Sequence, residues 1–313
     1  MRWIATLCVL LSFMLLLNNP AWAQAPAVKS QTAPSFTRVT AEQIEPTDSL
    51  PADEKDKEDR STQEAATADL TTQTSQPETS ASVGSGVEVE IGSSYDFLNN
   101  GFDDWREYYL SISKRFTDGK GIYGSFRQAR LFALNDQELL IGFQSPLSPR
   151  WSGLVEASMS PSHRVLAKWS LYGQLKRTIG ENWGVQFGLG HTEYSDARFN
   201  TGALTVERNW ERYRAAYTLS ANQLPGAGTG ASHLAQVNHY YGDGSSVVLS
   251  AAFGQEVDNL GPVGTIRTDV RGFSVGGRHW FLTRWAITYQ AGLYRQGDFF
   301  TRQSIRLGLR HRF

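Results

Sequence analysis

The chain has 313 residues, with 30 Lys and Arg against 31 Asp and Glu and a formal net charge of −1. Up to Val83 it carries 6 basic and 11 acidic residues, which leaves 24 basic and 20 acidic residues, a net of +4, for the remainder. A body this mildly cationic lacks the basic stripe of a nucleic-acid-binding protein. Nucleic acid is therefore excluded as a partner.

The N-terminus has the three parts of an export signal. Arg2 supplies a positive start, residues 4–17 are almost unbroken apolar, and Ala21-Trp22-Ala23 forms an A-x-A cleavage site. The apolar run is shorter than the roughly 20 residues that a membrane-spanning helix needs, so residues 1–23 are predicted to be a removable signal peptide. Cys8, the one cysteine, lies inside it. The mature chain is expected to have no disulfide and no thiol chemistry.

Residues 24–84 are rich in Ser, Thr, Ala, Gln and Pro, and Phe36 is the one aromatic residue among them. Such a segment cannot bury enough apolar surface to offset chain entropy. This predicts a disordered periplasmic linker in front of a β-barrel over residues 85–313. Two roles stay open for the linker: a flexible leader, or a tether to the cell wall or a partner.

From Gly86 onward, apolar residues alternate with polar ones at the period of two that is typical of β-strands. We predict fourteen strands, and twelve if one hairpin is misread. The predicted segments are residues 87–97, 105–116, 122–132, 137–147, 151–160, 168–179, 183–194, 203–210, 213–222, 233–241, 246–255, 268–280, 285–294 and 300–313.

The predicted connections alternate in length. The even-numbered ones are tight, as at residues 117–121, 148–150 and 180–182, whereas most odd-numbered ones are longer, as at residues 223–232 and 256–267. Short periplasmic turns and longer outer loops are the pattern of bacterial outer-membrane barrels. The predicted fold class is therefore all-β: a transmembrane, antiparallel, up-and-down β-barrel in the cell outer membrane, with both ends in the periplasm.

Aromatic residues collect beside the tight turns. Trp and Tyr prefer the depth of the lipid headgroups, because their rings are apolar and their N–H or O–H groups are polar. The residues of this predicted girdle are Trp151, Trp183, Trp210, Tyr213, Tyr241, Trp280, Trp285 and Phe313.

The last predicted strand ends at Phe313. Leu307 and Leu309 share one parity with it, and Arg310 and Arg312 share the other. This alternation suits a closing strand with lipid on one face and the lumen on the other. It predicts outer-membrane lipid and lipopolysaccharide as surroundings, and the barrel-assembly machinery as a partner of this strand.

Five short stretches stand out within the barrel region. They are residues 95–107 (YDFLNNGFDDWRE), 160–166 (SPSHRVL), 191–194 (HTEY), 214–218 (RAAYT) and 278–280 (RHW). Together they resemble the YaiO family of outer-membrane β-barrels over residues 87–313. The resemblance implies an integral outer-membrane protein whose biochemical role is undefined, and it carries over no catalytic residue. Some relatives resemble accessories of surface polysaccharide production.

Parity places the charged side chains on the inner face, because a charge on the lipid face near mid-bilayer would cost roughly 2–4 kcal/mol. The predicted lumen-lining residues carry both signs: Glu156, Lys176, Glu207, Arg214, Arg278 and Arg306. Two interpretations stay open: a network that fills and rigidifies the barrel, or a polar conduit or ligand site. Aqueous lumens are usual at 16–18 strands and filled interiors at eight. A count of fourteen strands therefore does not decide between the two interpretations. A narrow barrel that passes or binds a small polar or glycan-like solute is the first functional hypothesis, and a surface adhesion module is a weaker one.

His191 and Glu193 share the outward face near the outer end of their strand. A His oriented by a carboxylate beside lipid headgroups would suit a lipid hydrolase. The nucleophile is missing, because Ser170, Thr201 and Thr205 have inward parity. We therefore expect no enzyme and no catalytic residue, with an outer-membrane lipid-modifying hydrolase at His191 and Glu193 as the alternative.

Other candidate motifs are weak. The six histidines lack metal-ligand spacing, so neither a metal nor a cofactor is expected. Ser162-His163 and Ser232-His233 lie at or beside outer loops. Adjacent residues point to opposite faces of a strand, so neither pair is a ready nucleophile and base. Residues 226–230 are glycine-rich and predicted to form a mobile loop. Five oxygen-bearing side chains in the first outer hairpin are interpreted as turn formers or as ligands of a divalent ion that bridges lipopolysaccharide phosphates. These are Asp96, Asn99, Asn100, Asp103 and Asp104.

Overall fold

The computed structural model describes residues 86–195, 197–225, 228–242, 244–259 and 265–313. The predicted signal peptide and linker lie outside the described residues. Among the described residues, no helix has the length and hydropathy to cross a membrane.

Fourteen strands make up the described part of the chain. They are β1 (Gly86–Leu98), β2 (Trp105–Arg115), β3 (Gly121–Leu131), β4 (Leu134–Ser148), β5 (Trp151–Met159), β6 (Trp169–Ile179), β7 (Trp183–Glu193), β8 (Arg198–Trp210), β9 (Tyr213–Leu224), β10 (Gly228–Tyr241), β11 (Ser245–Asn259), β12 (Thr265–Trp280), β13 (Trp285–Gln296) and β14 (Phe300–Arg312).

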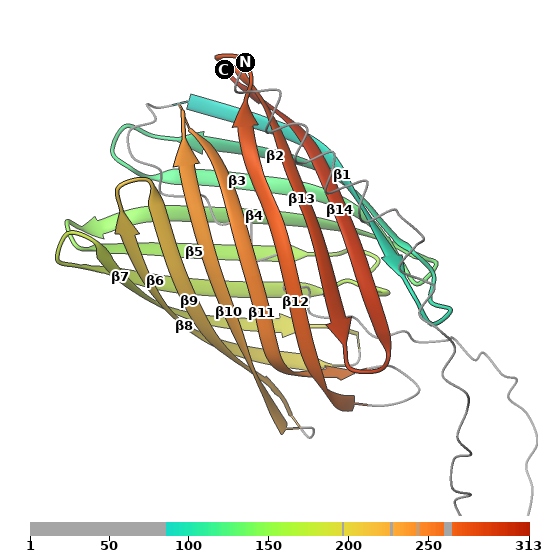
Figure 1. The fold of residues 1–313 in the computed structure, drawn as a ribbon. Coiled ribbons are helices and arrows are strands. Elements are labelled where there is room, and N and C mark those ends of the chain that lie inside the picture. Colours follow the sequence, from blue (N-terminus) through green and yellow to red (C-terminus); the bar gives the residue numbers. More distant parts are fainter. Residues whose placement is uncertain (1–85, 196, 226–227, 243, 260–264) are drawn as a thin grey trace, which may run out of the picture. The chain divides into compact units, whose positions relative to one another are not determined.

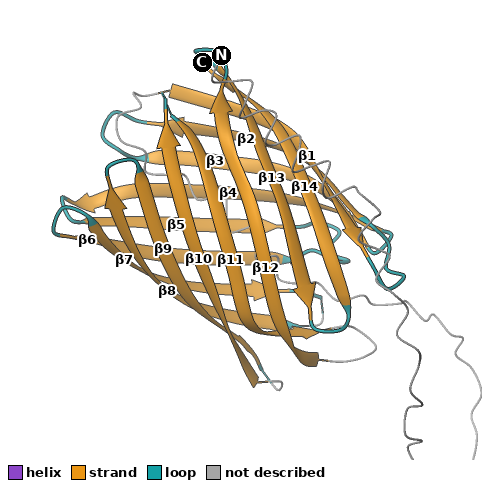
Figure 2. Cartoon of the chain, in the orientation of Figure 1, coloured by secondary structure: helices purple, strands orange, loops and turns teal. Residues whose placement is uncertain are grey.

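Each strand pairs antiparallel with the next, and β1 pairs with β14, so the sheet closes into a barrel (Figure 1). Figure 2 shows that the wall is strand throughout, with loops confined to the two ends. The predicted fourteen-strand barrel is confirmed, and the twelve-strand alternative is wrong. We call the end where β1 begins and β14 ends the proximal rim, and the opposite end the distal rim.

The two faces of the wall differ in chemistry, as the period of two predicts. Ile91, Tyr108 and Leu139 point outward and expose 62%, 63% and 55% of their surface. Glu90 and Glu107, one residue away from two of them, point inward and are buried. An outer face of contiguous apolar side chains requires a hydrocarbon environment, because soluble proteins rarely expose such large apolar patches.

Several strands are longer at the distal rim than the sequence predicts. β9 to β12 continue into the predicted outer loops at residues 223–232 and 256–267: β9 ends at Leu224 and β10 begins at Gly228, and β11 ends at Asn259 and β12 begins at Thr265. Gln223 pairs with Thr229 in this extension. The prediction was wrong here because it followed apolar side chains, whereas the hydrogen-bonded ladder needs only backbone groups. For the same reason residues 228–230 of the predicted mobile loop are strand, while residues 226–227 lie outside the described residues.

The hairpin between β3 and β4 is tighter than predicted. Phe132 and Ala133 form a two-residue turn in which both residues have positive φ, 49° and 64°. This geometry suits the right-handed twist of the flanking strands but usually selects Asn or Gly. The Phe132 ring packs edge-on against Trp105, with ring centroids 5.1 Å apart.

Aromatic side chains flank the proximal turns on the outer face. Trp151, Trp183 and Trp210 are exposed there, and Arg208 lies over the Trp183 ring. Trp280 departs from the predicted girdle. Its ring faces inward, 4.0 Å from the Arg312 guanidinium, because Trp280 has the same parity as the inward-facing residues of β12.

Candidate functional site

The inner wall is the candidate site, and one of its charge clusters surrounds Glu207 on β8. Its carboxylate accepts hydrogen bonds from Arg214 Nε and Nη2 at 2.9 and 2.6 Å and from Gln186 Nε2 at 2.8 Å. Lys176 forms an ion pair with the second carboxylate oxygen. Three of the predicted lumen-lining residues, from three different strands, therefore meet at one point.

Glutamines extend this cluster toward β6. Gln174 donates to Gln186 at 2.7 Å, and the Tyr172 hydroxyl donates to Gln174 at 3.1 Å. The chain of polar groups from Tyr172 to Glu207 thus crosses three strands. Satisfied networks of this kind hold their side chains in one arrangement.

A second cluster lies on β2, β3, β4 and β14. Arg127 bonds Glu107 at 3.1 Å and Glu138 at 3.2 Å, and Arg306 bonds Glu107 at 3.1 Å. Arg306 was among the predicted residues. The other three were not, although the outward parity of Tyr108 indicates that Glu107 faces inward.

The seam between the first and last strands carries a third cluster. Arg310 bonds Glu90 at 2.6 Å and Glu88 at 3.1 Å, and Arg312 bonds Glu88 at 2.9 Å. Glu90 also accepts hydrogen bonds from the Tyr109 and Thr288 hydroxyls, each at 2.8 Å. These contacts tie the two ends of the described chain together.

The remaining two predicted residues are Glu156 and Arg278. Glu156 accepts a hydrogen bond of 2.7 Å from the Tyr123 hydroxyl. Arg278 donates to the Gly244 carbonyl at 3.1 Å near the proximal rim. A pocket of about 60 Å³ opens on that side of the barrel, lined in part by Glu88, Tyr123 and Arg312. The structure therefore does not gather the six predicted residues into one site.

A family model described as the YaiO membrane beta barrel domain matches residues 87–259, more than half of the chain. The chain belongs to the YaiO membrane β-barrel family. The predicted family resemblance is confirmed. No curated protein matches the sequence.

Solved structures with a similar fold include three membrane barrels. A bacterial polysaccharide outer membrane secretin is 12% identical, with a TM-score of 0.46 over 74% of this chain and 100% of the other. The KdgM porin is 11% identical, with a TM-score of 0.42 over 72% and 99% of the two chains. OmpF of Salmonella typhi is 8% identical, with a TM-score of 0.43 over 72% and 97%.

One distal loop of this YaiO-family barrel folds onto the inner wall. The β5–β6 loop (residues 160–168) packs Val165 and Leu166 against Ala129, whose side chain is fully buried on the inner face. Asp136 Oδ2 accepts hydrogen bonds from the backbone N–H groups of both loop residues, at 2.6 and 2.8 Å. The sequence analysis placed this segment among the outer loops. In the sequence, Asp136 is a single acidic residue at a position of inward parity, and this was the signal that the loop has a partner on the inner wall.

Aromatic rings narrow the distal rim beside that loop. The Arg302 guanidinium lies 5.0 Å from the Trp105 ring and 5.2 Å from the Tyr294 ring. Phe300 packs edge-on against Trp105, and the Tyr294 hydroxyl donates to buried Glu256 at 2.8 Å. At the distal rim, aromatic rings therefore surround the buried charges of Arg302 and Glu256.

The polar residues of the first distal hairpin form hydrogen bonds within this hairpin and with the neighbouring β13–β14 hairpin. Asn99 Oδ1 accepts from the Thr301 backbone N–H at 2.6 Å, and Asn100, with φ of 62°, donates to the Phe299 carbonyl at 2.6 Å. Asp104 accepts from the Tyr95 hydroxyl at 2.6 Å and from the Leu98 N–H at 3.1 Å. These bonds lower the pKa of Asp104 below its usual 3.8, the Tyr95 bond most. These contacts favour the interpretation as turn formers.

The proposed hydrolase residues do not act on each other. His191 Nδ1 bonds Asn200 Oδ1 at 2.8 Å, and Glu193 pairs with Lys168 at 3.5 Å. Directly opposite His191 lie Leu171 and Asn200, neither of which is a nucleophile. Within the described part of the chain, no group of three or more His, Cys, Asp or Glu residues has the arrangement of a metal site.

Proposed function

We propose that the protein is an integral outer-membrane barrel whose lumen passes or binds small polar solutes that carry negative charge, such as acidic sugars. The observation that supports this proposal is the layering of charge on the inner wall. Carboxylates lie against the wall, and the cations that pair with them reach further into the lumen.

The exposed fractions of the side chains express this layering. Lys176 and Arg214 expose 23% and 20%, whereas their partner Glu207 exposes 1%. Arg306 exposes 31% against 7% for Glu107. The Arg302–Asp96 pair at the distal rim is an exception. A solute in the lumen would therefore meet guanidinium and ammonium groups before carboxylates.

Such layering favours anions even where the charges balance. Each pair is a dipole with its positive end toward the lumen, and charged walls concentrate ions of opposite sign within a low-dielectric channel. Rings of Arg and Lys are the usual lining of anion and phosphate pores.

The dimensions of the wall limit the size of the solute. Fourteen strands about 4.8 Å apart and tilted about 40° close a circle roughly 28 Å across between backbones. Inward side chains and the β5–β6 loop occupy part of that width. This size fits a small solute or a single extended glycan chain rather than a folded macromolecule.

The location in the outer membrane also belongs to the proposal. An even-stranded barrel with an apolar outer band and aromatic rims is the architecture of bacterial outer-membrane proteins. In that setting, lipid and lipopolysaccharide would surround the wall, and the barrel-assembly machinery would act on the strand that ends at Phe313.

Planar-bilayer recordings of the full chain test the proposal. In a KCl gradient we expect ohmic steps whose reversal potential lies on the chloride side. Lys176→Gln combined with Arg306→Gln should move that potential toward zero, because both cations face the lumen. Arg208→Gln, an outward charge of the same type, should leave it unchanged. Silent bilayers, or selectivity for potassium, would contradict the proposal.

A further inference from the structure

Two pairs of arginines face each other on the outer surface of the barrel near the distal rim. Arg106 on β2 lies directly opposite Arg130 on β3, and Arg271 on β12 lies directly opposite Arg295 on β13. All four side chains are exposed. The same unusual pairing thus occurs twice, at the same end of the barrel.

Both pairings are unfavourable in the barrel alone. Residues directly opposite on antiparallel strands have Cβ atoms roughly 4.5–5.5 Å apart, and like charges at this spacing destabilise a sheet. Arginine is always protonated in proteins. Both guanidinium groups of each pair therefore stay charged at every physiological pH, and an anion between them would remove their repulsion.

One arginine of each pair is held in place by its own hairpin. Arg106 Nη2 donates to the Tyr95 hydroxyl at 3.4 Å, and its guanidinium lies 5.0 Å from the Tyr95 ring. Arg295 bonds Asp298 at 2.9 Å and the Gly297 carbonyl at 2.9 Å. Each pair thus contains one cation whose position is set before any ligand arrives.

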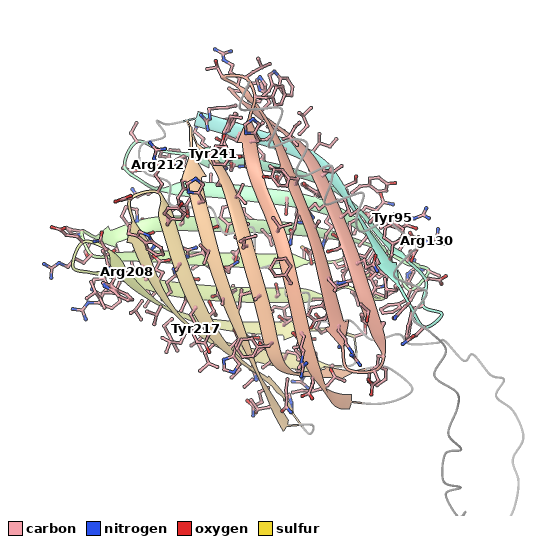
Figure 3. The ribbon with its side chains drawn as sticks, viewed as in Figure 1. Tyr95, Arg130, Arg208, Arg212, Tyr217 and Tyr241 are labelled. Atoms are coloured by element: carbon pink, nitrogen blue, oxygen red, sulfur yellow. The ribbon has the colours of Figure 1, made fainter. Side chains whose placement is uncertain are left out.

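The other arginine of each pair has no such contact. Within the described residues, neither Arg130 nor Arg271 forms an ion pair or a side-chain hydrogen bond. Asp269, the acid closest in sequence to Arg271, accepts a hydrogen bond from Gln255 instead. Figure 3 shows Tyr95 and Arg130 at the distal end of the barrel. Two cations near an anchored partner are therefore available to a ligand.

The surroundings of both pairs are mostly apolar on the side toward the middle of the barrel. Exposed Tyr108 and Leu110 come next to Arg106 on that face, and exposed Phe126 follows Arg130 after one polar residue, Gln128. Exposed Phe273 and Leu293 come next to Arg271 and Arg295. The rest of a ligand that bridges the arginines would lie along this apolar surface. A phosphate that carries acyl chains fits this combination, whereas a free phosphate would use the arginines alone.

We propose that each arginine pair binds the phosphate of an anionic lipid headgroup, with the acyl chains of that lipid along the adjacent apolar side chains. The planar guanidinium matches phosphate oxygens with two parallel N–H bonds. The guanidinium groups of two arginines on neighbouring strands bind one phosphate, and the charge of this phosphate removes the repulsion between the two arginines.

Native mass spectrometry of the full chain in a neutral detergent tests this site. The probes are dioleoyl phosphatidic acid, the matching phosphatidylcholine and inorganic phosphate. We expect phosphatidic acid to bind, with the affinity lowered about tenfold at the altered pair by Arg130→Gln or Arg271→Gln, the effect of one charge-assisted hydrogen bond. Arg208→Gln is the matched control, because Arg208 faces Trp183 and Ala215 at the proximal rim and lies far from Arg130 in Figure 3.

A second measurement separates ligand binding from a structural role. In lipid-free detergent, Arg130→Gln should raise the melting temperature, because it removes the like-charge contact. With phosphatidic acid present, it should lose part of the stabilisation that the wild type gains. An equal loss of stability with and without lipid would overturn the proposal. So would equal binding of phosphatidic acid and phosphatidylcholine, or saturation by inorganic phosphate at the same concentration.

Discussion

Gly184 on β7 and Glu207 on β8 lie directly opposite each other, and the Glu207 carboxylate occupies the space that a side chain at position 184 would fill. A Cβ placed on Gly184 would lie 2.7 Å from one carboxylate oxygen. Lys176, Arg214 and Gln186 all depend on that carboxylate. Gly184 thus makes room for the charge cluster around Glu207.

Gly184→Ala should therefore destabilise the barrel by about 1–3 kcal/mol, the usual cost of overpacking. Glu207 is held by three partners and cannot move aside without loss of contacts. Urea unfolding in lipid vesicles, followed by tryptophan fluorescence, measures the change. Gly173→Ala is the control, because a Cβ there meets no atom within 4 Å. Equal effects of the two substitutions would refute the packing argument.

Asp136→Ala should release the β5–β6 loop from the inner wall. The backbone N–H groups of Val165 and Leu166 lose their acceptor, and each unsatisfied buried donor costs about 1–3 kcal/mol. Trypsin should then cleave faster after Arg164, and the single-channel conductance should rise. Asp118→Ala removes an exposed carboxylate from the β2–β3 turn and should change neither value. Unchanged cleavage after Arg164 would show that the loop is held by other contacts.

The seam between β1 and β14 should depend on coupled charges. Arg310→Gln should cost about 3–5 kcal/mol, because it leaves the buried Glu90 carboxylate without its cation. Glu90→Gln combined with Arg310→Gln should cost less than the sum of the single changes, by about 0.5–3 kcal/mol. Unfolding free energies of the four variants, wild type included, form the required cycle. Simple additivity would mean that the two side chains act independently.

The Tyr95–Asp104 bond should make the first distal hairpin sensitive to acid. The pKa of folded Asp104 lies below its usual 3.8, so the bond contributes stability above that value and loses it as the pH falls through the folded pKa. Tyr95→Phe removes the main cause of the shift and should flatten the stability profile in the acid range below the usual pKa of 3.8. Melting temperatures measured across that range check this. An identical slope in both proteins would be evidence against the bond.

The alternation of apolar and polar residues by itself determined the class of fold and the number of strands, and it predicted an inward position for six charged residues. This was within reach of the sequence because the period of two is a local property of an extended chain. Glu156, Lys176 and Glu207 could all be assigned to the inner face from their immediate neighbours. The ends of the strands were harder to predict from the sequence, since β9 to β12 continue through backbone hydrogen bonds after the apolar pattern stops.

Only the tertiary structure decided which of these residues meet. Lys176, Glu207 and Arg214 come together because the register of β6 to β9 offsets each from the next by only two residues along the strands, and Arg130 opposes Arg106 through the register of β2 and β3. Register depends on how the whole sheet closes, and a shift of two residues would keep every side chain on its face while changing every partner. The fold of the β5–β6 loop onto Asp136 is likewise a contact between distant segments, for which the local pattern holds no information.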